Sequence, residues 1–143
     1  DLLIIHPPYF NSYKYSSITS LETYWMGIDH ADIRKKEIRE FFKVGKPENS
    51  QKFIDDMSIA LNNSIDMVKN KGYLALMLGD AVIRNEYIPI VSEVLNNSKI
   101  DSSKIKTAAV RIPKYTESSW ASSQRRTSEK VGINLCDFII VRN

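Results

Sequence analysis

Short, uniformly apolar segments alternate with helical patterns along this chain, and this alternation constrains its fold more than any other feature. Such segments are too short for amphipathic helices and are typical of buried strands. The clearest lie at residues 1–5 and 73–78. Two further strands are predicted at residues 104–112, which also contain charged residues, and at 135–142, which hold a near-continuous apolar run from Phe138 to Val141. Strands that alternate with helices predict an α/β fold with a largely parallel sheet.

Between the predicted strands, apolar residues recur at helical spacing. The clearest pattern covers residues 50–71, with Ser50 as a candidate N-cap and Gly72 as a candidate C-terminal glycine. Its apolar stripe consists of Phe53, Met57, Leu61, Ile65 and Val68. The other predicted helices are 18–28, 31–43 and 87–97, the last with Pro89 in its first turn.

No internal repeat or linker divides residues 1–143, so we expect a single domain. We expect three layers, with helices on both faces of the sheet. The predicted strand order across the sheet is 1–5, 73–78, 135–142, 104–112. The third strand in this order is predicted to be antiparallel, since no helix separates the last two strands along the chain.

Composition excludes several classes of protein. The chain is 43% apolar and 26% charged, which is typical of a soluble globular domain. Neither a bilayer-spanning run nor a signal segment is visible in it. The single Cys136 excludes an internal disulfide and a cysteine-cluster zinc site, and it favours a reducing, cytoplasmic setting. The formal net charge of +3 is too small by itself to indicate nucleic acid.

The most distinctive local feature is His6-Pro7-Pro8-Tyr9, which directly follows the first predicted strand. Ligands of open α/β sheets bind beyond the carboxyl ends of strands. The two prolines fix the backbone and have no N–H, so this turn presents mainly acceptors. Acceptors beside an aromatic ring suit an exocyclic amino group of a nucleobase. If the turn accepts hydrogen bonds from the amino N–H groups, the nitrogen lone pair becomes available for attack. The aromatic side chain could stack on a base that has left the duplex.

The segment from Asp1 to Tyr9 resembles the catalytic motif of the amino-directed DNA methyltransferases, which modify adenine N6 or cytosine N4. In that family an apolar strand precedes Asp, Asn or Ser and then Pro-Pro-Tyr or Pro-Pro-Phe. The resemblance covers nearly the whole chain, and the Pro-Pro-Tyr turn is its specific part. It continues through Asn11, Tyr13, Leu21-Glu22, Trp25-Met26-Gly27, Val68 to Asp80, and Asp137 to Arg142.

This resemblance implies the catalytic, C-terminal half of a Rossmann-like methyltransferase fold, with a mixed sheet and flanking helices. It implies methyl transfer from S-adenosylmethionine to DNA in a prokaryotic restriction–modification or genome-marking setting. His6 and the Pro7 carbonyl would accept the amino hydrogens, Pro8 would stiffen the turn, and Tyr9 would stack on the flipped base. Cofactor contacts are expected from His6 and Asp80.

Further DNA contacts are expected in two places. Asn11 and Tyr13 follow the turn directly and join Tyr9 as candidate base or backbone contacts. The Ser-rich segment 113–134 and its preceding strand end hold five basic residues against two acidic ones, a net +3. The candidate phosphate contacts there are Arg111, Lys114, Arg125 and Arg126. A solvated loop is the competing interpretation.

His6 departs from the family pattern, which has Asp, Asn or Ser at this position. A neutral imidazole has one acceptor nitrogen and an imidazolium has none. We therefore expect activity to fall when His6 is protonated. The alternative is a degenerate, inactive site.

The glycines also depart from the pattern. The chain has five, and no two form the G-x-G of a cofactor loop. Because the chain begins within an apolar strand, we expect a piece of a longer protein whose cofactor-binding half lies upstream. The isolated piece should be inactive and bind S-adenosylmethionine poorly.

Several alternatives stay open at this stage. A methyltransferase-like module without catalysis could bind nucleic acid or a partner subunit, and methylation of RNA or of a protein glutamine uses a similar turn. Phe10, Tyr13 and Tyr15 are explained more simply as core or loop anchors than as base contacts. Trp25 is expected in the core. Asp80 is explained more simply as a helix cap or loop anchor than as a cofactor ligand. His30, beside the candidate N-cap Asp29, is not expected to bind a metal.

Overall fold

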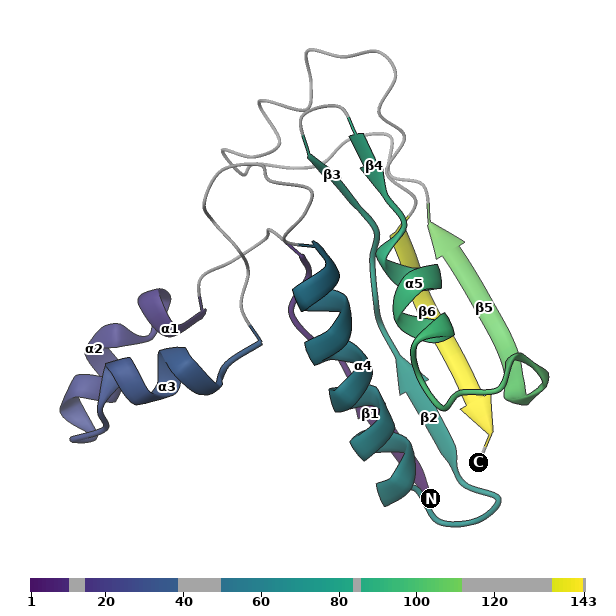
Figure 1. The fold of residues 1–143 in the computed structure, drawn as a ribbon. Helices are drawn as coiled ribbons and strands as arrows, with labels where there is room; N and C mark the ends of the chain where they lie inside the picture. The colour runs from purple at the N-terminus through teal and green to yellow at the C-terminus, as the bar shows by residue number, and fades with distance from the viewer. Residues whose placement is uncertain (11–14, 39–49, 84–85, 112–134, 143) are drawn as a thin grey trace.

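A computed structural model describes residues 1–10, 15–38, 50–83, 86–111 and 135–142 of the chain. Its centre is a four-stranded mixed sheet (Figure 1). Across the sheet the strands are β1 (Leu2–Ile5), β2 (Tyr73–Leu76), β6 (Leu135–Arg142) and β5 (Ile105–Arg111). β1 is parallel to β2, while β6 is antiparallel to both β2 and β5. The predicted strand order and the antiparallel third strand are confirmed.

One face of this sheet is covered by α4 (Ser50–Met67) and α5 (Ile90–Asn96) (Figure 1). The predicted apolar stripe of α4 is buried, with Phe53, Met57 and Leu61 fully inaccessible. Burial of each such side chain contributes roughly 1.5–3 kcal/mol. The stripe belongs to one core cluster with strand residues that include Leu74, Leu76, Ile139 and Val141.

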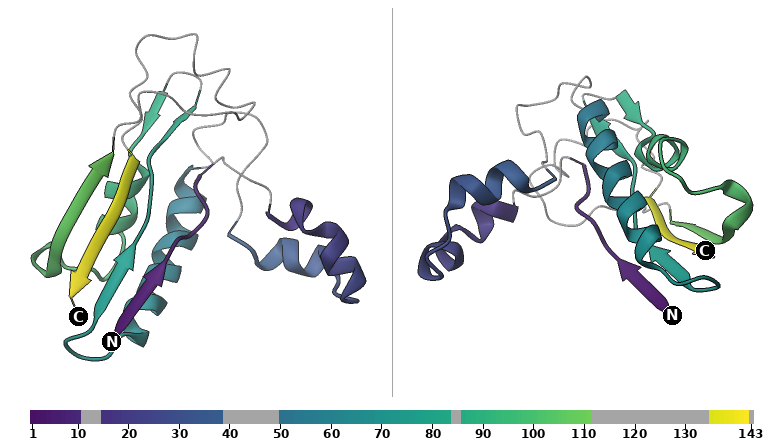
Figure 2. Two further views of the ribbon diagram at one scale, coloured as in Figure 1. Left: turned by 180° about the vertical axis from the view of Figure 1, so that it is seen from behind. Right: turned by 60° about the horizontal axis from the view of Figure 1, so that its bottom comes forward.

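The opposite face of the sheet has no helix over it among the described residues (Figure 2). Leu2 and Ile4 alternate with the core-facing side chains of β1 and are 62% and 63% exposed. The described residues therefore form two layers, and the prediction of three was wrong for them. Strands with apolar side chains on both faces predict helices packed on both faces of the sheet. Here the two helices that pack on the sheet, α4 and α5, lie on the same face.

Three short helices form a unit beside the sheet: α1 (Tyr15–Ile18), α2 (Ser20–Trp25) and α3 (His30–Lys36). The single helix predicted over 18–28 is interrupted at Thr19 and ends before Gly27, whose φ is +68°. α3 starts at a confirmed N-cap, since Asp29 accepts a hydrogen bond from the Ala31 amide at 2.8 Å. The prediction that Trp25 belongs to the core was wrong, because its side chain is 80% exposed.

The turn between α4 and β2 uses Gly72 differently from the prediction. The residue with a left-handed backbone is Lys71, with φ +65°, and not the glycine. Gly72 is needed for close approach, because a Cβ there would lie 2.7 Å from Val68 Cγ1 and 2.9 Å from the Lys69 carbonyl oxygen. The next amide, from Tyr73, donates to the Asp1 carbonyl at 2.9 Å and starts the pairing of β2 with β1.

A small antiparallel hairpin follows β2 and was not predicted. It consists of β3 (Ala81–Ile83) and β4 (Glu86–Ile88). The first two residues of the helix predicted over 87–97 therefore lie in β4, and α5 begins at Ile90. Strands of three residues are too short for period-two alternation to distinguish them from loop.

Candidate functional site

The His6–Tyr9 turn lies where the two parallel strands of the sheet end together. Ile5 on β1 pairs with Leu76 on β2, and the Ile5 carbonyl accepts a hydrogen bond from the Met77 amide at 3.0 Å. Because β1 and β2 run in the same direction, the segments that leave them, 6–9 and 77–80, lie at the same edge. The predicted placement of the turn at a carboxyl-end sheet edge is confirmed.

Within the turn, His6 and Tyr9 contact each other. The His6 Nε2 atom lies 3.0 Å from the Tyr9 hydroxyl oxygen, and the two rings meet edge to face with centroids 5.2 Å apart. His6 is exposed and Tyr9 is half-buried. The Pro-Pro sequence between them holds the chain in a turn that brings residues three apart into contact.

This contact determines what the imidazole can offer a ligand. If the Tyr9 hydroxyl donates to Nε2, then Nδ1 carries the proton and neither ring nitrogen is a free acceptor. If Nε2–H donates to the tyrosine oxygen, Nδ1 is left as an acceptor. Only the second tautomer of His6 can accept a hydrogen bond from an amino group.

Phe10 anchors the end of the turn to the core. Its side chain is buried, and its ring lies 5.1 Å from that of Phe53 on α4. The prediction that Phe10 is a core or loop anchor is confirmed, and the core is its position. Pro7, Pro8 and Tyr9 are half-buried and His6 is exposed, so one side of the turn packs on the protein and the other side is accessible to a ligand.

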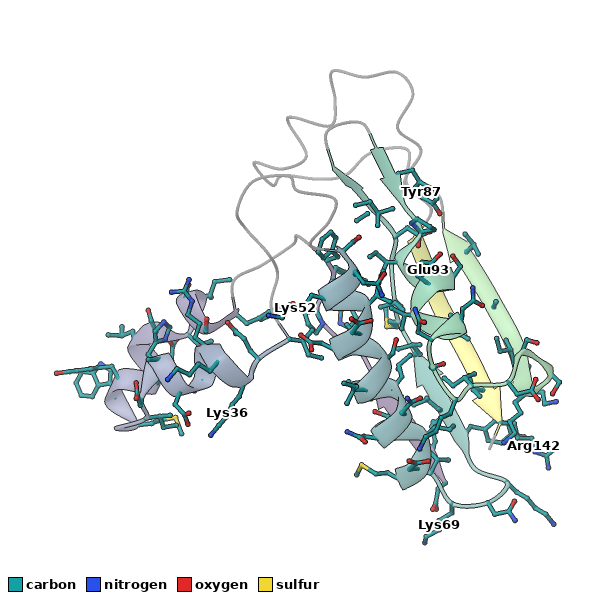
Figure 3. The ribbon with its side chains drawn as sticks, in the orientation of Figure 1. Lys36, Lys52, Lys69, Tyr87, Glu93 and Arg142 are labelled. Atoms are coloured by element: carbon teal, nitrogen blue, oxygen red, sulfur yellow. The ribbon has the colours of Figure 1, made fainter. Side chains whose placement is uncertain are left out.

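Asp80 ends the neighbouring segment and holds together the structure around it. Its Oδ1 atom accepts a hydrogen bond from the Val91 amide at 2.8 Å, and Oδ2 accepts one from the Tyr87 hydroxyl at 2.6 Å. Tyr87 lies on β4, beside the start of α5 (Figure 3). The N-cap residue of α5 is Pro89, whose side chain cannot accept a hydrogen bond. Asp80, nine residues earlier in the sequence, caps the helix in its place. The expectation of a helix cap is confirmed, while its role as a cofactor ligand stays a prediction.

Of the predicted nucleic-acid contacts, the structure places Arg111. It is the last residue of β5, which is antiparallel to β6 and therefore runs in the same direction as β1 and β2. β5 thus ends on the same side of the sheet as the His6–Tyr9 turn, on the strand farthest from β1. Its last residue pairs with Leu135, four residues before Ile139, the partner of Leu76. Asn11, Tyr13, Lys114, Arg125 and Arg126 lie outside the described residues.

His30 is placed away from this edge, in the first turn of α3. Its Nδ1 atom is buried and makes no hydrogen bond to the described residues. No group of three or more His, Cys, Asp or Glu side chains suited to a metal ion occurs in the described part of the chain.

Sequence reasoning missed the pairing of His6 with Tyr9 and the contact of Tyr87 with Asp80. The contact of His6 with Tyr9 has a recognisable signal in the sequence, because a histidine and a tyrosine that flank two prolines can meet in a tight turn. The second has none, because the hairpin that carries Tyr87 is itself invisible in the sequence pattern.

Comparison of the chain with protein-family models, with curated proteins and with solved structures found no match. Among the described helices, none is long and apolar enough to cross a membrane.

Proposed function

We propose that this chain carries the amino-gripping turn of an enzyme that methylates an exocyclic amino group of DNA, adenine N6 or cytosine N4, with S-adenosylmethionine as methyl donor. The observation that carries the proposal is the His6-Pro7-Pro8-Tyr9 turn at the joint carboxyl end of β1 and β2. This is the position at which open α/β sheets bind their ligands.

The residues of the turn have complementary tasks in this proposal. His6 Nδ1 and the Pro7 carbonyl accept the two amino hydrogens, which lets the nitrogen become more tetrahedral and exposes its lone pair. Pro8 keeps the acceptors in fixed positions. Tyr9 stacks on the base after it leaves the duplex, at a cost of a few kcal/mol for unstacking that the stacking partly offsets.

The contact between His6 and Tyr9 adds a condition to this scheme. For Nδ1 to accept, Nε2 must carry the proton and donate to the Tyr9 hydroxyl, 3.0 Å away. Protonation of His6 leaves that donation intact and removes the acceptor at Nδ1. Protonation should therefore remove the hydrogen bond from the amino group to His6 while the contact between His6 and Tyr9 stays in place.

The described residues do not form a site for S-adenosylmethionine by themselves. The sequence has no glycine-rich loop, and both oxygens of Asp80 already accept hydrogen bonds from Val91 and Tyr87. S-adenosylmethionine would supply the methyl group. We assign most of its binding to residues other than those described, with His6 and Asp80 as the contacts predicted from this chain. The part proposed for this chain is to extrude, stack and orient the base.

The test is methylation by the complete gene product, with unmethylated DNA, labelled S-adenosylmethionine and nucleoside analysis of the product. We expect N6-methyladenine or N4-methylcytosine, and at least a hundredfold loss for His6→Ala and Tyr9→Ala, about 2.7 kcal/mol of transition-state stabilisation. The chain offers matched controls: His30 is its only other histidine, and Tyr73 is an exposed tyrosine at the far end of β2. His30→Ala and Tyr73→Ala should retain activity; equal losses for all four variants would refute the proposal.

A binding module without catalysis is the second candidate, and His6 is the observation that favours it. If the Tyr9 hydroxyl donates to Nε2, the ring offers no free acceptor and the turn can hold a base without activating it. This candidate predicts DNA binding that depends on Tyr9, with no methylated nucleoside. RNA and a protein glutamine are tested as substrates in the same assay.

A further inference from the structure

β1 stands at one side of the sheet but has the residues of an interior strand. Leu2–Ile5 are all apolar, which is typical of a parallel strand that is covered on both faces. In the interior strand β2, residues 74–76 are indeed at most 2% exposed. In β1, by contrast, Leu2 and Ile4 are 62% and 63% exposed, and the other two residues are only half-buried. The described residues therefore cover neither face of β1 completely.

The backbone of β1 also directs polar groups away from the sheet. The Asp1 and Ile5 carbonyls accept hydrogen bonds from the β2 side, at 2.9 and 3.0 Å. Because backbone direction alternates along a strand, the N–H and C=O groups of Leu2 and Ile4 point away from β2. β1 is the last strand of the sheet on that side, and no described strand lies beyond it (Figure 2). We call this side of β1 the open edge.

The opposite edge of the sheet is protected against further pairing, and the open edge is not. β5 carries the charged Lys106, and its pairing with β6 shifts register twice, between Ile105 and Thr107 and between Ala109 and Val110. Charges and bulges are features by which edge strands avoid pairing with further strands. β1 has neither, since its register with β2 is regular over all four residues and none of them is charged.

The groups on the open edge determine what can cover them. A row of backbone N–H and C=O groups at strand spacing is matched by another extended backbone. The apolar side chains on both faces of β1 favour a parallel neighbour. A second copy would pair β1 with itself, and a twofold axis perpendicular to the sheet makes those two strands antiparallel. Parallel neighbours are joined by a crossover within one polypeptide, which favours a strand of the same gene product.

We propose that the sheet continues past the open edge with a strand that pairs in parallel with β1 and is supplied by the same gene product outside residues 1–143. Because the added strand runs in the direction of β1, its carboxyl end lies beside the His6–Tyr9 turn. The turn then lies between two strand ends, and the segment that follows the added strand forms one wall of the candidate site. The pairing itself does not depend on the proposed methyl transfer.

The experiment is amide hydrogen exchange of the complete gene product, with its leucine and isoleucine residues labelled with ¹⁵N. The Ile4 amide reports on the open edge, and the matched control is Ile5, whose backbone faces β2. We expect the Ile4 amide to exchange within about tenfold of the rate of Ile5. In the 143-residue chain alone, Ile4 should exchange at least about a hundredfold faster than Ile5.

Two matched variants of the complete gene product give a second readout. Ile4→Lys places a charge beside the added strand and should lower the midpoint of urea unfolding. Val110→Lys changes a side chain of similar exposure on the protected edge, 59% against 63%, and should leave the midpoint unchanged. Because both variants are compared in the complete gene product, this readout does not require the 143-residue chain to fold alone.

Three results would overturn the proposal. Fast exchange of Ile4 in the complete gene product would show that β1 is an edge strand there as well. Protection of Ile4 in the monomeric 143-residue chain would assign the open edge to residues of this chain. Protection that appears only as the concentration of this chain rises would assign it to a second copy. A protected Ile4 in a gene product that forms no methylated nucleoside would refute the proposed function and support this inference.

Discussion

Removal of the Asp80 carboxylate should show that this residue is a structural support of the candidate site. In Asp80→Ala, the Val91 amide at the start of α5 loses its acceptor, which costs about 1 kcal/mol, as for other helix caps. The Tyr87 hydroxyl loses a charged acceptor as well. Because Tyr87 is 46% exposed and water can replace the acceptor, we take the low end for such a bond, about 1 kcal/mol.

The total of about 2 kcal/mol corresponds to a fall in Tm of roughly 6–8 °C for a chain of this length. Asp80→Asn keeps an acceptor oxygen for the Val91 amide and should lose about half as much. The assay is urea unfolding followed by circular dichroism, with a double-mutant cycle. Tyr87→Phe should cost about 1 kcal/mol in the wild type and clearly less in Asp80→Ala, where its charged acceptor is already gone.

The opposite result would refute this reasoning. If Asp80→Ala unfolds within about 0.5 kcal/mol of the wild type and the complete gene product loses S-adenosylmethionine binding, the carboxylate acts on the cofactor and not on α5.

Three further predictions concern the turn, the acid response of the fold and the site. Gly72→Ala should destabilise the chain by about 1–3 kcal/mol in urea unfolding because its Cβ meets the Lys69 carbonyl, while Lys71→Gly, which relieves a left-handed side chain, should be neutral or slightly stabilising. The backbone N–H of Ser103, followed by the Ser103 hydroxyl, holds the pKa of Asp101 below its ordinary value. The ionised Asp101 carboxylate therefore stabilises the fold at pH values above its unfolded-state pKa. This contribution is lost as the pH falls through the pKa of Asp101 in the folded state. The stability difference between the wild type and Asp101→Asn should vanish in acid, and ¹³C titration of Asp101 at its ordinary pKa would contradict this. Finally, methylation by the complete gene product should fall in acid for the wild type, and His6→Asp should shift that acidic limb; superimposable profiles would show that His6 is not the titrating acceptor.

The sheet could be predicted from the sequence because its signals are strong and local. Apolar segments marked β1, β2 and β6, a more mixed segment marked β5, and the absence of a helical pattern in the sequence between the last two strands predicted the antiparallel β6. Each of the four strands of this sheet lies within one of the predicted ranges. The position of the candidate turn followed from the same reasoning, since His6 comes directly after β1.

Other features could not be predicted because the pattern does not encode them. The spacing of Leu21 and Trp25 shows that one helix face is apolar, but not what covers it, so an outward stripe looks the same as a core stripe. The hairpin at 81–88 gives no periodic signal. The contact between His6 and Tyr9 depends on side-chain geometry inside a turn, which residue types alone do not determine.

The position of β2 in the sheet has a consequence for how the chain folds. Its neighbours are the first and last strands: Leu74 pairs with Leu3 on one side and with Val141 on the other, each about 70 residues away in sequence. Contacts this distant require large loops to close before they stabilise anything, which slows folding. During synthesis, α4 and β2 emerge long before Ile139 and Val141, which complete their core. Until β6 has been synthesised, β2 keeps an unpaired apolar edge, which exposes the nascent chain to strand-to-strand aggregation.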